Sequence, residues 1–243
     1  MLVNGALGKI RGPLRRMGYR LEKNERLTLF EPLLYARLQK VGVKDFFFVQ
    51  IGANDGVSSD PIYRFVTDTK VAGVVVEPVR DVYAKLVENY CRFPEVRPVN
   101  LAIHKTDKTA HIYRVSTEAG ERLGCWSRGI ASFHQDHHKL TGTPAASVEA
   151  EEVSCVSLSE LFQQCKVHLL DLLQIDTEGY DSEILNMIPF GEIKPAIIRF
   201  EHGLPDGIMS PSVFKECTDL LTAQGYYIIT EPYDAVAYLP RMI

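Results

Sequence analysis

Short, nearly continuous apolar runs recur along most of the chain. They are FFFVQI (46–51), VAGVVV (71–76), VRPVNLAI (96–103), LLDLLQI (169–175) and PAIIRF (195–200). Such runs are typical of strands that are covered on both faces, as in a parallel sheet. Helical patterns separate several of them, for example in residues 81–93, 157–165 and 210–225. Strands and helices in alternation predict a doubly wound α/β fold.

The two ends of the chain and one internal segment depart from this pattern. Only the turn-like EPYD separates GYYIIT (225–230) from AVAYLP (235–240), which predicts a C-terminal antiparallel hairpin. Residues 1–45 contain a basic run and then a helical pattern, so we expect an N-terminal helical extension before a main domain at 46–243. Residues 117–150 show no periodicity, and we expect an irregular insertion that forms a substrate lid.

The composition and charge of the chain exclude several classes of protein. The chain has 243 residues, of which 46% are hydrophobic, so it can form one sizeable core. Its 27 basic and 31 acidic residues give a net charge of -4, and we therefore expect no nucleic-acid partner. No apolar stretch approaches the roughly 20 residues of a spanning helix, and no signal peptide is evident. We expect no integral membrane segment and a cytoplasmic location.

A glycine turn follows the first predicted strand, in the sequence QIGANDG (50–56). Gly52 and Gly56 permit positive φ, and Asn54 tolerates the left-handed region, so the turn can be tight. A strand, a glycine turn and a helix in this order present backbone N–H groups to an anion. Asn54 and Val57 stand where a dinucleotide fingerprint requires glycines, which argues against a dinucleotide oxidoreductase.

A carboxylate ends the second predicted strand. Glu77 lies 21 residues after Gly56, at a position from which it can accept hydrogen bonds from both hydroxyls of a ribose. The glycine turn and Glu77 together predict a ligand that contains a nucleoside. The alternative is a sharp turn followed by a surface glutamate.

Five segments occur in a recognisable order: QIGANDG, VVVEP, VNLAI, LLQIDTEGYDSEIL and PAIIRFEH. In this order they resemble the motifs of the FkbM family of S-adenosylmethionine-dependent methyltransferases, from about Phe46 to the C-terminus. The resemblance implies a class I methyltransferase fold, which is a Rossmann-like sheet of seven strands with the last pair antiparallel. It also implies S-adenosylmethionine as cofactor and O-methylation of a hydroxyl on a sugar, glycan precursor or secondary metabolite.

Carried over by position, the resemblance implies a cofactor site along one edge of the sheet. Its residues are Gln50, Gly52, Ala53, Asn54 and Gly56 for the methionine part, Glu77 and Pro78 beside the ribose, Asn100 and Ala102 near the adenine, and Asp176. Many members carry an acidic residue where Gln50 stands, and Gln50 lacks the charge that would pair with the cofactor's amino group. This departure keeps open a second hypothesis, a non-catalytic nucleoside-binding or scaffolding module.

Polar residues that follow later strands should face the same edge. Asp176 follows one strand, and Glu201 with His202 follows the next. Methyl transfer to a hydroxyl benefits from a general base, and histidine has a suitable pKa. We expect His202 or an insertion histidine (His134, His137, His138) to be the base, with Asp176 and Glu201 orienting the substrate or cofactor. The alternatives are a turn role for His202 and a solvated loop for the other three.

The same residues raise the question of a metal ion. Asp176, Glu201 and His202 offer the oxygen and imidazole ligands that a divalent cation such as Mg²⁺ accepts. No ligand spacing in the sequence requires a metal, so the favoured interpretation does without one. Glu178, which lies beside Gly179, follows the same strand as Asp176 and should also face the ligand; the alternative is that it begins the following helix.

Overall fold

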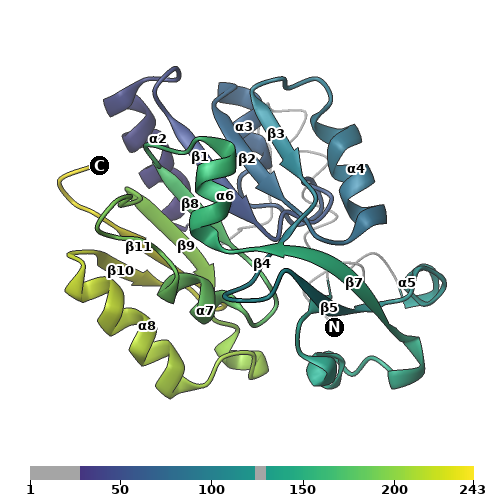
Figure 1. Cartoon of the computed structure of the whole chain (residues 1–243). Coiled ribbons are helices and arrows are strands. Elements are labelled where there is room, and N and C mark those ends of the chain that lie inside the picture. Colours follow the sequence, from purple (N-terminus) through teal and green to yellow (C-terminus); the bar gives the residue numbers. More distant parts are fainter. Residues whose placement is uncertain (1–27, 124–129) are drawn as a thin grey trace, which may run out of the picture.

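A seven-stranded sheet forms the centre of the computed structural model, which describes residues 28–123 and 130–243 (Figure 1). The strand order is β10-β11-β9-β8-β1-β2-β3. The strands are β1 (Phe47–Ile51), β2 (Ala72–Val76), β3 (Val96–Val99), β8 (Leu172–Ile175), β9 (Ile197–Glu201), β10 (Tyr227–Thr230) and β11 (Asp234–Tyr238). All neighbours pair in parallel except β11, which is antiparallel to both β9 and β10. The predicted doubly wound sheet and C-terminal hairpin are therefore confirmed.

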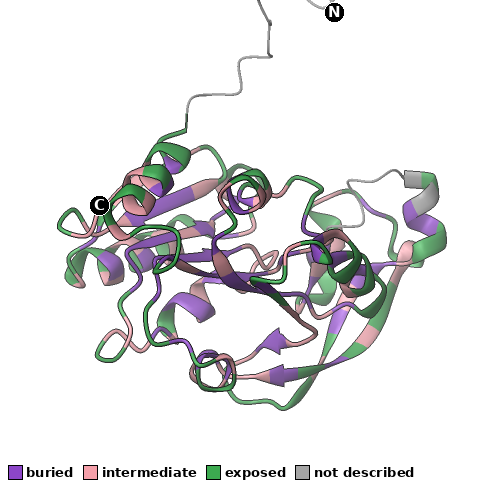
Figure 2. Ribbon diagram, turned by 90° about the horizontal axis from the view of Figure 1, so that it is seen from above, coloured by how far each residue is buried: buried purple, intermediate pink, exposed green. Residues whose placement is uncertain are grey.

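Helices cover both faces of this sheet, as the continuous apolar runs predict. Phe48 and Val49 point to opposite faces of β1, and neither has any exposed surface. One face packs against α2 (Phe30–Val41), α3 (Tyr63–Thr69) and α4 (Arg80–Tyr90). The other packs against α6 (Leu158–Cys165), α7 (Asp181–Asn186) and α8 (Pro211–Ala223). Figure 2 shows the buried strands between exposed outer helix faces.

A second, smaller sheet lies beside the first and was not predicted. It has the order β4-β7-β5-β6, with β4 at Ala102–Ile103, β5 at Thr109–Val115, β6 at Ala131–Ser132 and β7 at Val148–Val156. The run VRPVNLAI, expected to form one strand, is divided between β3 of the first sheet and β4 of the second. β7 shows no continuous apolar run because many of its side chains are exposed, Glu149 and Glu152 among them.

The segment expected to be irregular contains short elements of regular structure. Between β5 and β7 lie α5 (Thr117–Leu123), β6 and two 3-10 helices, η2 (Gln135–Lys139) and η3 (Ala145–Ser147). Another 3-10 helix, η4 (Leu204–Asp206), follows β9. Residues 1–27, which carry the basic run, and 124–129 of the predicted lid lie outside the described residues. No helix that the structure describes has the length and apolarity to span a bilayer.

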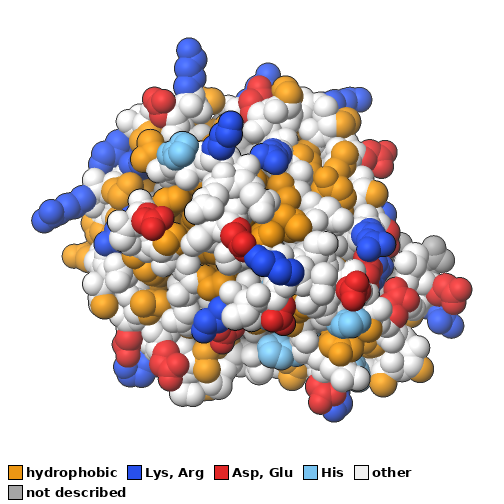
Figure 3. All heavy atoms as spheres, in the orientation of Figure 1, with side chains coloured by type: hydrophobic (Ala, Val, Ile, Leu, Met, Phe, Trp, Pro, Cys, Tyr) orange, Lys and Arg blue, Asp and Glu red, His pale blue; other side chains and the backbone are white. Residues whose placement is uncertain are grey.

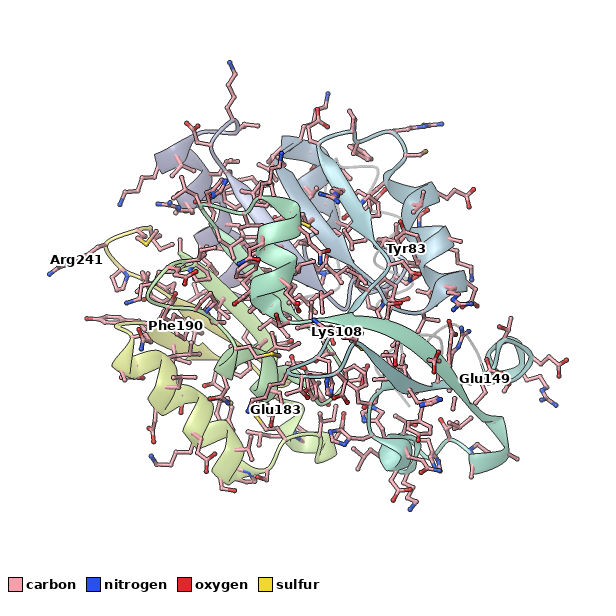
Figure 4. The ribbon with its side chains drawn as sticks, viewed as in Figure 1. Tyr83, Lys108, Glu149, Glu183, Phe190 and Arg241 are labelled. Carbon is pink, nitrogen blue, oxygen red and sulfur yellow. The ribbon has the colours of Figure 1, made fainter. Side chains whose placement is uncertain are left out.

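Arg114 of β5 joins the second sheet to the main domain. Its guanidinium group forms ion pairs with Asp81 of α4 and with Glu149 and Glu151 of β7, and Figure 4 labels Glu149 on this sheet. The hydrogen bond from Arg114 lowers the pKa of the Asp81 carboxyl. Arg114 is largely buried, whereas Asp81 and Glu149 are exposed, so the network is only partly shielded from water. The ion pair with Asp81 connects the second sheet to α4 of the main domain.

Candidate functional site

A cavity of about 270 Å³ lies where β1, β2 and β8 end, between the two sheets. The glycine turn and the strand ends form one side, and Ile112, Ala131 and Phe133 from the second sheet and the segment after it form the other. The predicted cofactor residues that line the cavity are Gln50, Gly52, Ala53, Asn54, Glu77, Pro78, Ala102 and Asp176. Gly56 and Asn100 are not part of its lining.

The glycine turn has the left-handed geometry that the sequence predicted. Gly52, Asn54 and Gly56 have φ values of 77°, 50° and 75°. A Cβ atom on Gly52 would lie 1.7 Å from the carbonyl oxygen of Asp176, and one on Gly56 would lie 2.6 Å from the ring of Tyr90. Gly52 therefore lets the turn after β1 contact the turn after β8, and Gly56 lets the turn pack on α4.

Glu77 is bonded to the glycine turn. Its Oε2 accepts the Asn54 N–H at 3.0 Å, and its Oε1 accepts the Val79 N–H at 2.9 Å. Burial raises the pKa of Glu77 to about 7, although the two N–H groups lower it. Asn100 supports this segment from behind, because its Nδ2 donates to the carbonyl oxygens of Glu77 and Pro78 at 2.9 Å each.

Asp60 lies on the same cavity wall, and the sequence did not single it out. The Nε2 of Gln50 donates to its Oδ2 at 3.1 Å. Its Oδ1 accepts the N–H groups of Ile62 and Tyr63 at 2.7 and 2.9 Å, at the start of α3. Burial raises the pKa of Asp60 to about 6. An Asp before Pro61 is a signal for the start of a helix, but that pattern alone does not indicate a ligand.

Three carboxylates meet near the other end of the cavity, which Asp176 and Glu178 line and Glu201 does not. Carboxylate oxygens of Asp176, Glu178 and Glu201, hereafter the acidic cluster, lie within 4.8 Å of one another. Burial raises the pKa of Glu201 to about 10, with further increases from the charges of Asp176 and Glu178. Burial and the charge of Asp181 also raise the pKa of Asp176 well above its ordinary value. The acidic cluster therefore holds a proton at neutral pH.

The acidic cluster is also the set of residues that could hold a metal ion. Three carboxylates at this separation form a donor set that suits a hard divalent cation. The Oε2 of Glu201 is buried and has no hydrogen-bond partner among residues 28–123 and 130–243. Glu178 thus takes the place that the sequence had suggested for His202, which is not part of the cluster.

His202 lies away from the cavity lining and is only 1% exposed. Its Nε2 lies 3.1 Å from the carbonyl oxygen of Glu231, and its Nδ1 accepts the N–H of Leu204 at 3.1 Å. Both ring nitrogens therefore have backbone partners, as in the turn role considered above. The assignment of His202 as a base stays a prediction.

The insertion histidines lie on or near η2, and one of them contacts the acidic cluster. The Nε2 of His137 lies 2.9 Å from Oε2 of Glu178, and His137 is buried. His138 instead bonds through Nδ1 to the carbonyl oxygen of Thr143 at 2.8 Å, while the ring of His134 lies exposed near Gly179. None of the three histidines lines the cavity, but His137 can orient the Glu178 carboxylate of the cluster.

The insertion also fixes the backbone of Glu178. The Oγ of Ser132 donates to the Glu178 carbonyl oxygen at 2.7 Å. Glu178 has a φ of 54° and α7 starts at Asp181, so Glu178 does not begin the helix, which was the alternative considered above. In the sequence, the position of Glu178 directly after a buried strand and next to Gly179 was the feature that indicated a functional residue.

Comparison with known proteins shows which family the sequence matches. The family model described as "Methyltransferase FkbM domain" matches residues 50–228. The comparison with curated proteins gave no match.

Several solved structures have a similar arrangement, with low identity. The fibrillarin pre-rRNA processing protein of Methanococcus jannaschii is 14% identical over 85% of this chain and 74% of its own, with a TM-score of 0.43. Precorrin-6y C5,15-methyltransferase from Geobacter metallireducens is 12% identical over 89% and 92%, with a TM-score of 0.39. A human methyltransferase 10 domain containing protein is 11% identical over 96% of both chains, with a TM-score of 0.41.

Proposed function

Because the chain belongs to the methyltransferase FkbM domain family, we propose that it uses S-adenosylmethionine to O-methylate a hydroxyl of a sugar, glycan precursor or secondary metabolite. The observation that carries this proposal is the hydrogen bond from the Asn54 N–H to Glu77. This hydrogen bond keeps the glycine turn and the Glu77 carboxylate side by side in the wall of one cavity. A ligand with a carboxylate tail and a ribose needs this pair of groups.

The residues around the cavity fit each part of such a cofactor. The backbone amides of the glycine turn suit its carboxylate, as N–H groups beside a helix do for other anions. Each oxygen of Glu77 accepts one N–H and keeps a lone pair for a ribose hydroxyl. Val79, Leu101 and Ala102 supply apolar surface for the adenine.

The acidic cluster supplies the chemistry that the acceptor needs. When bound, the cofactor offers a methyl group on a positively charged sulfur, which leaves as a neutral thioether once the carbon–sulfur bond breaks. We assign to the cluster the removal of the hydroxyl proton as the acceptor oxygen bonds to that methyl group. We place the proton that the cluster already holds on Glu201, so that Asp176 remains a carboxylate that can accept the hydroxyl proton. General-base catalysis of this kind typically contributes about 10² to 10⁴ in rate.

Ala131 and Phe133 of the insertion line the cavity, and we assign this side to the acceptor. Phe133 stands edge-on to Tyr180, with ring centroids 4.9 Å apart, and the ring of His104 stacks on Tyr180 with centroids 5.4 Å apart. Aromatic side chains of this kind suit the apolar face of a sugar ring. Lys and Arg side chains are interspersed with Asp and Glu on the face shown in Figure 3, a distribution that supports a small acceptor over a nucleic acid.

Calorimetric titration tests the proposal. S-adenosylhomocysteine should bind, and NAD should not. E77A should weaken the binding of S-adenosylhomocysteine by about 1.5–3 kcal/mol, the value of hydrogen bonds to a charged group. E88A, which removes an exposed glutamate of α4, should leave it unchanged. Binding of NAD alone would refute the proposal, and an unaltered affinity of E77A would remove Glu77 from the ribose role.

Catalysis needs a separate measurement. Labelled S-adenosylmethionine is incubated with a panel of sugar and metabolite hydroxyl acceptors, and methyl transfer is counted. Transfer to an oxygen supports the enzyme. Tight binding of the cofactor with no transfer to any acceptor would favour the non-catalytic module.

A further inference from the structure

Gln50 and Asp60 form one wall of the cavity beside the glycine turn. Gln50 comes from β1 and Asp60 from the segment just before α3, and the Gln50 Nε2 donates to Oδ2 of Asp60 at 3.1 Å. The other oxygen of Asp60 accepts the N–H groups of Ile62 and Tyr63. Both carboxylate oxygens therefore have hydrogen-bond partners that fix their position.

The amide oxygen of Gln50, Oε1, receives no hydrogen bond in the described part of the chain. Gln50 is also buried, with an exposed fraction of 2%. A reversed amide would bring Oε1 against the Asp60 carboxylate, so the contact with Asp60 sets the orientation. Buried acceptors are nearly always satisfied, which indicates that a donor arrives with a ligand.

Among residues 28–123 and 130–243, Asp60 forms no ion pair with a cation. The groups bonded to it are neutral N–H donors, and the negative charge of Asp55 raises its pKa further. A buried carboxylate and an unpartnered amide oxygen on one wall make a site for a group that carries both positive charge and several N–H donors. A primary ammonium has these properties.

We propose that Asp60 and the Oε1 of Gln50 together bind the α-ammonium group of the cofactor's methionine tail. This inference rests on the proposed function. It gives the tail's two charges different partners, with the carboxylate on the glycine-turn amides and the ammonium on Asp60. It also accounts for Gln50, because the negative charge that Gln50 lacks is supplied ten residues later in the sequence.

The test compares two ligands that differ in this amine. The probes are S-adenosylhomocysteine and its deamino analogue, which keeps the carboxylate. The wild-type chain should bind the deamino analogue about ten-fold or more weakly, the effect of a hydrogen bond to a charged group. D60N should weaken S-adenosylhomocysteine about ten-fold or more and leave the deamino analogue within two-fold. The Asn side chain keeps an Oδ1 for Ile62 and Tyr63, so α3 can still begin normally.

Two further variants sharpen the test. D68N removes an exposed carboxylate from α3 and should change the affinity for neither ligand. The double variant Q50E/D60N moves the carboxylate to β1 and should recover most of the affinity for S-adenosylhomocysteine.

Equal weakening of both ligands in D60N, or no weakening of either, would overturn the assignment. Failure of the wild-type chain to bind either ligand would instead overturn the proposed function.

Discussion

The two ends of the cavity differ in how their polar groups are satisfied. At the glycine turn, both oxygens of Glu77 receive backbone N–H groups. At the acidic cluster, burial and neighbouring carboxylates raise the pKa values of Asp176 and Glu201, and the buried Oε2 of Glu201 has no partner in the described residues. Glu77 is therefore satisfied before a ligand binds, whereas the acidic cluster is relieved by a proton, a cation or an acceptor. Binding geometry and reactivity therefore belong to different parts of one cavity.

The largest expected effect concerns the acidic cluster. D176N should lower methyl transfer by about 10² to 10⁴, because it removes the proton acceptor with the raised pKa. H202Q should lower it less than ten-fold, because His202 does not line the cavity. Transfer of labelled methyl groups, measured with cofactor binding in parallel, checks both. A large loss in H202Q with near-normal D176N would return the role of base to His202.

The next largest effect, on stability and cofactor binding, concerns the glycine turn. G52A should destabilise the fold by about 2–4 kcal/mol and abolish cofactor binding, because the new Cβ would overlap the Asp176 carbonyl. G42A is the matched control. Gly42 has a similar φ of 82° with a ψ of 158° and open space around it, so this change should cost about 1–3 kcal/mol from backbone strain alone and leave binding intact. Urea unfolding and calorimetry measure the two quantities, and equal destabilisation of the two variants would contradict the overlap.

A smaller effect should appear in the pH dependence of stability. The pKa values of Asp176 and Glu201 are raised on folding, so the folded chain binds more protons than the unfolded one above about pH 4.5. The free energy of unfolding should therefore fall as pH rises from about 5 towards 10.

E201Q should flatten this slope and add about 1–2 kcal/mol of stability at pH 8, because the amide needs no proton. E192Q, at an exposed glutamate, should do neither. Urea unfolding at pH 6 and pH 8 measures the slope. A slope in E201Q as steep as in the wild type would show that Glu201 is not the source.

The smallest effect is expected from metal removal. EDTA should leave methyl transfer unchanged, because a shared proton already relieves the charge of the acidic cluster. The measurement is turnover before and after dialysis against the chelator. A loss that Mg²⁺ restores would replace the proton with a metal ion on the acidic cluster.

The main sheet could be predicted because its strands are buried on both faces. Val49 and Val75 are fully buried members of apolar runs, and such runs need no knowledge of their neighbours to be recognised. The second sheet could not, because its strands are short or, like β7, face water over much of their length. Glu149, an exposed residue of β7, resembles any loop residue in the sequence.

The site was predictable where backbone conformation dictates residue type. Gly52 and Gly56 need positive φ, and this need is visible in the sequence. The pairing of Asp60 with Gln50 and of Glu178 with His137 depends on contacts between separate segments, so no local pattern revealed these pairs. The sequence left both roles of His202 open for the same reason, since its backbone partner Glu231 lies on another segment.

The contact between Gly52 and the backbone of Asp176 has a consequence for redesign. The carbonyl group of Asp176 packs against the glycine turn and also begins the loop that carries the acidic cluster. A designer who reshapes that loop to admit a bulkier acceptor would also shift the grip on the methyl donor. New acceptor specificity is therefore best sought in the insertion, which approaches the cavity from the opposite side.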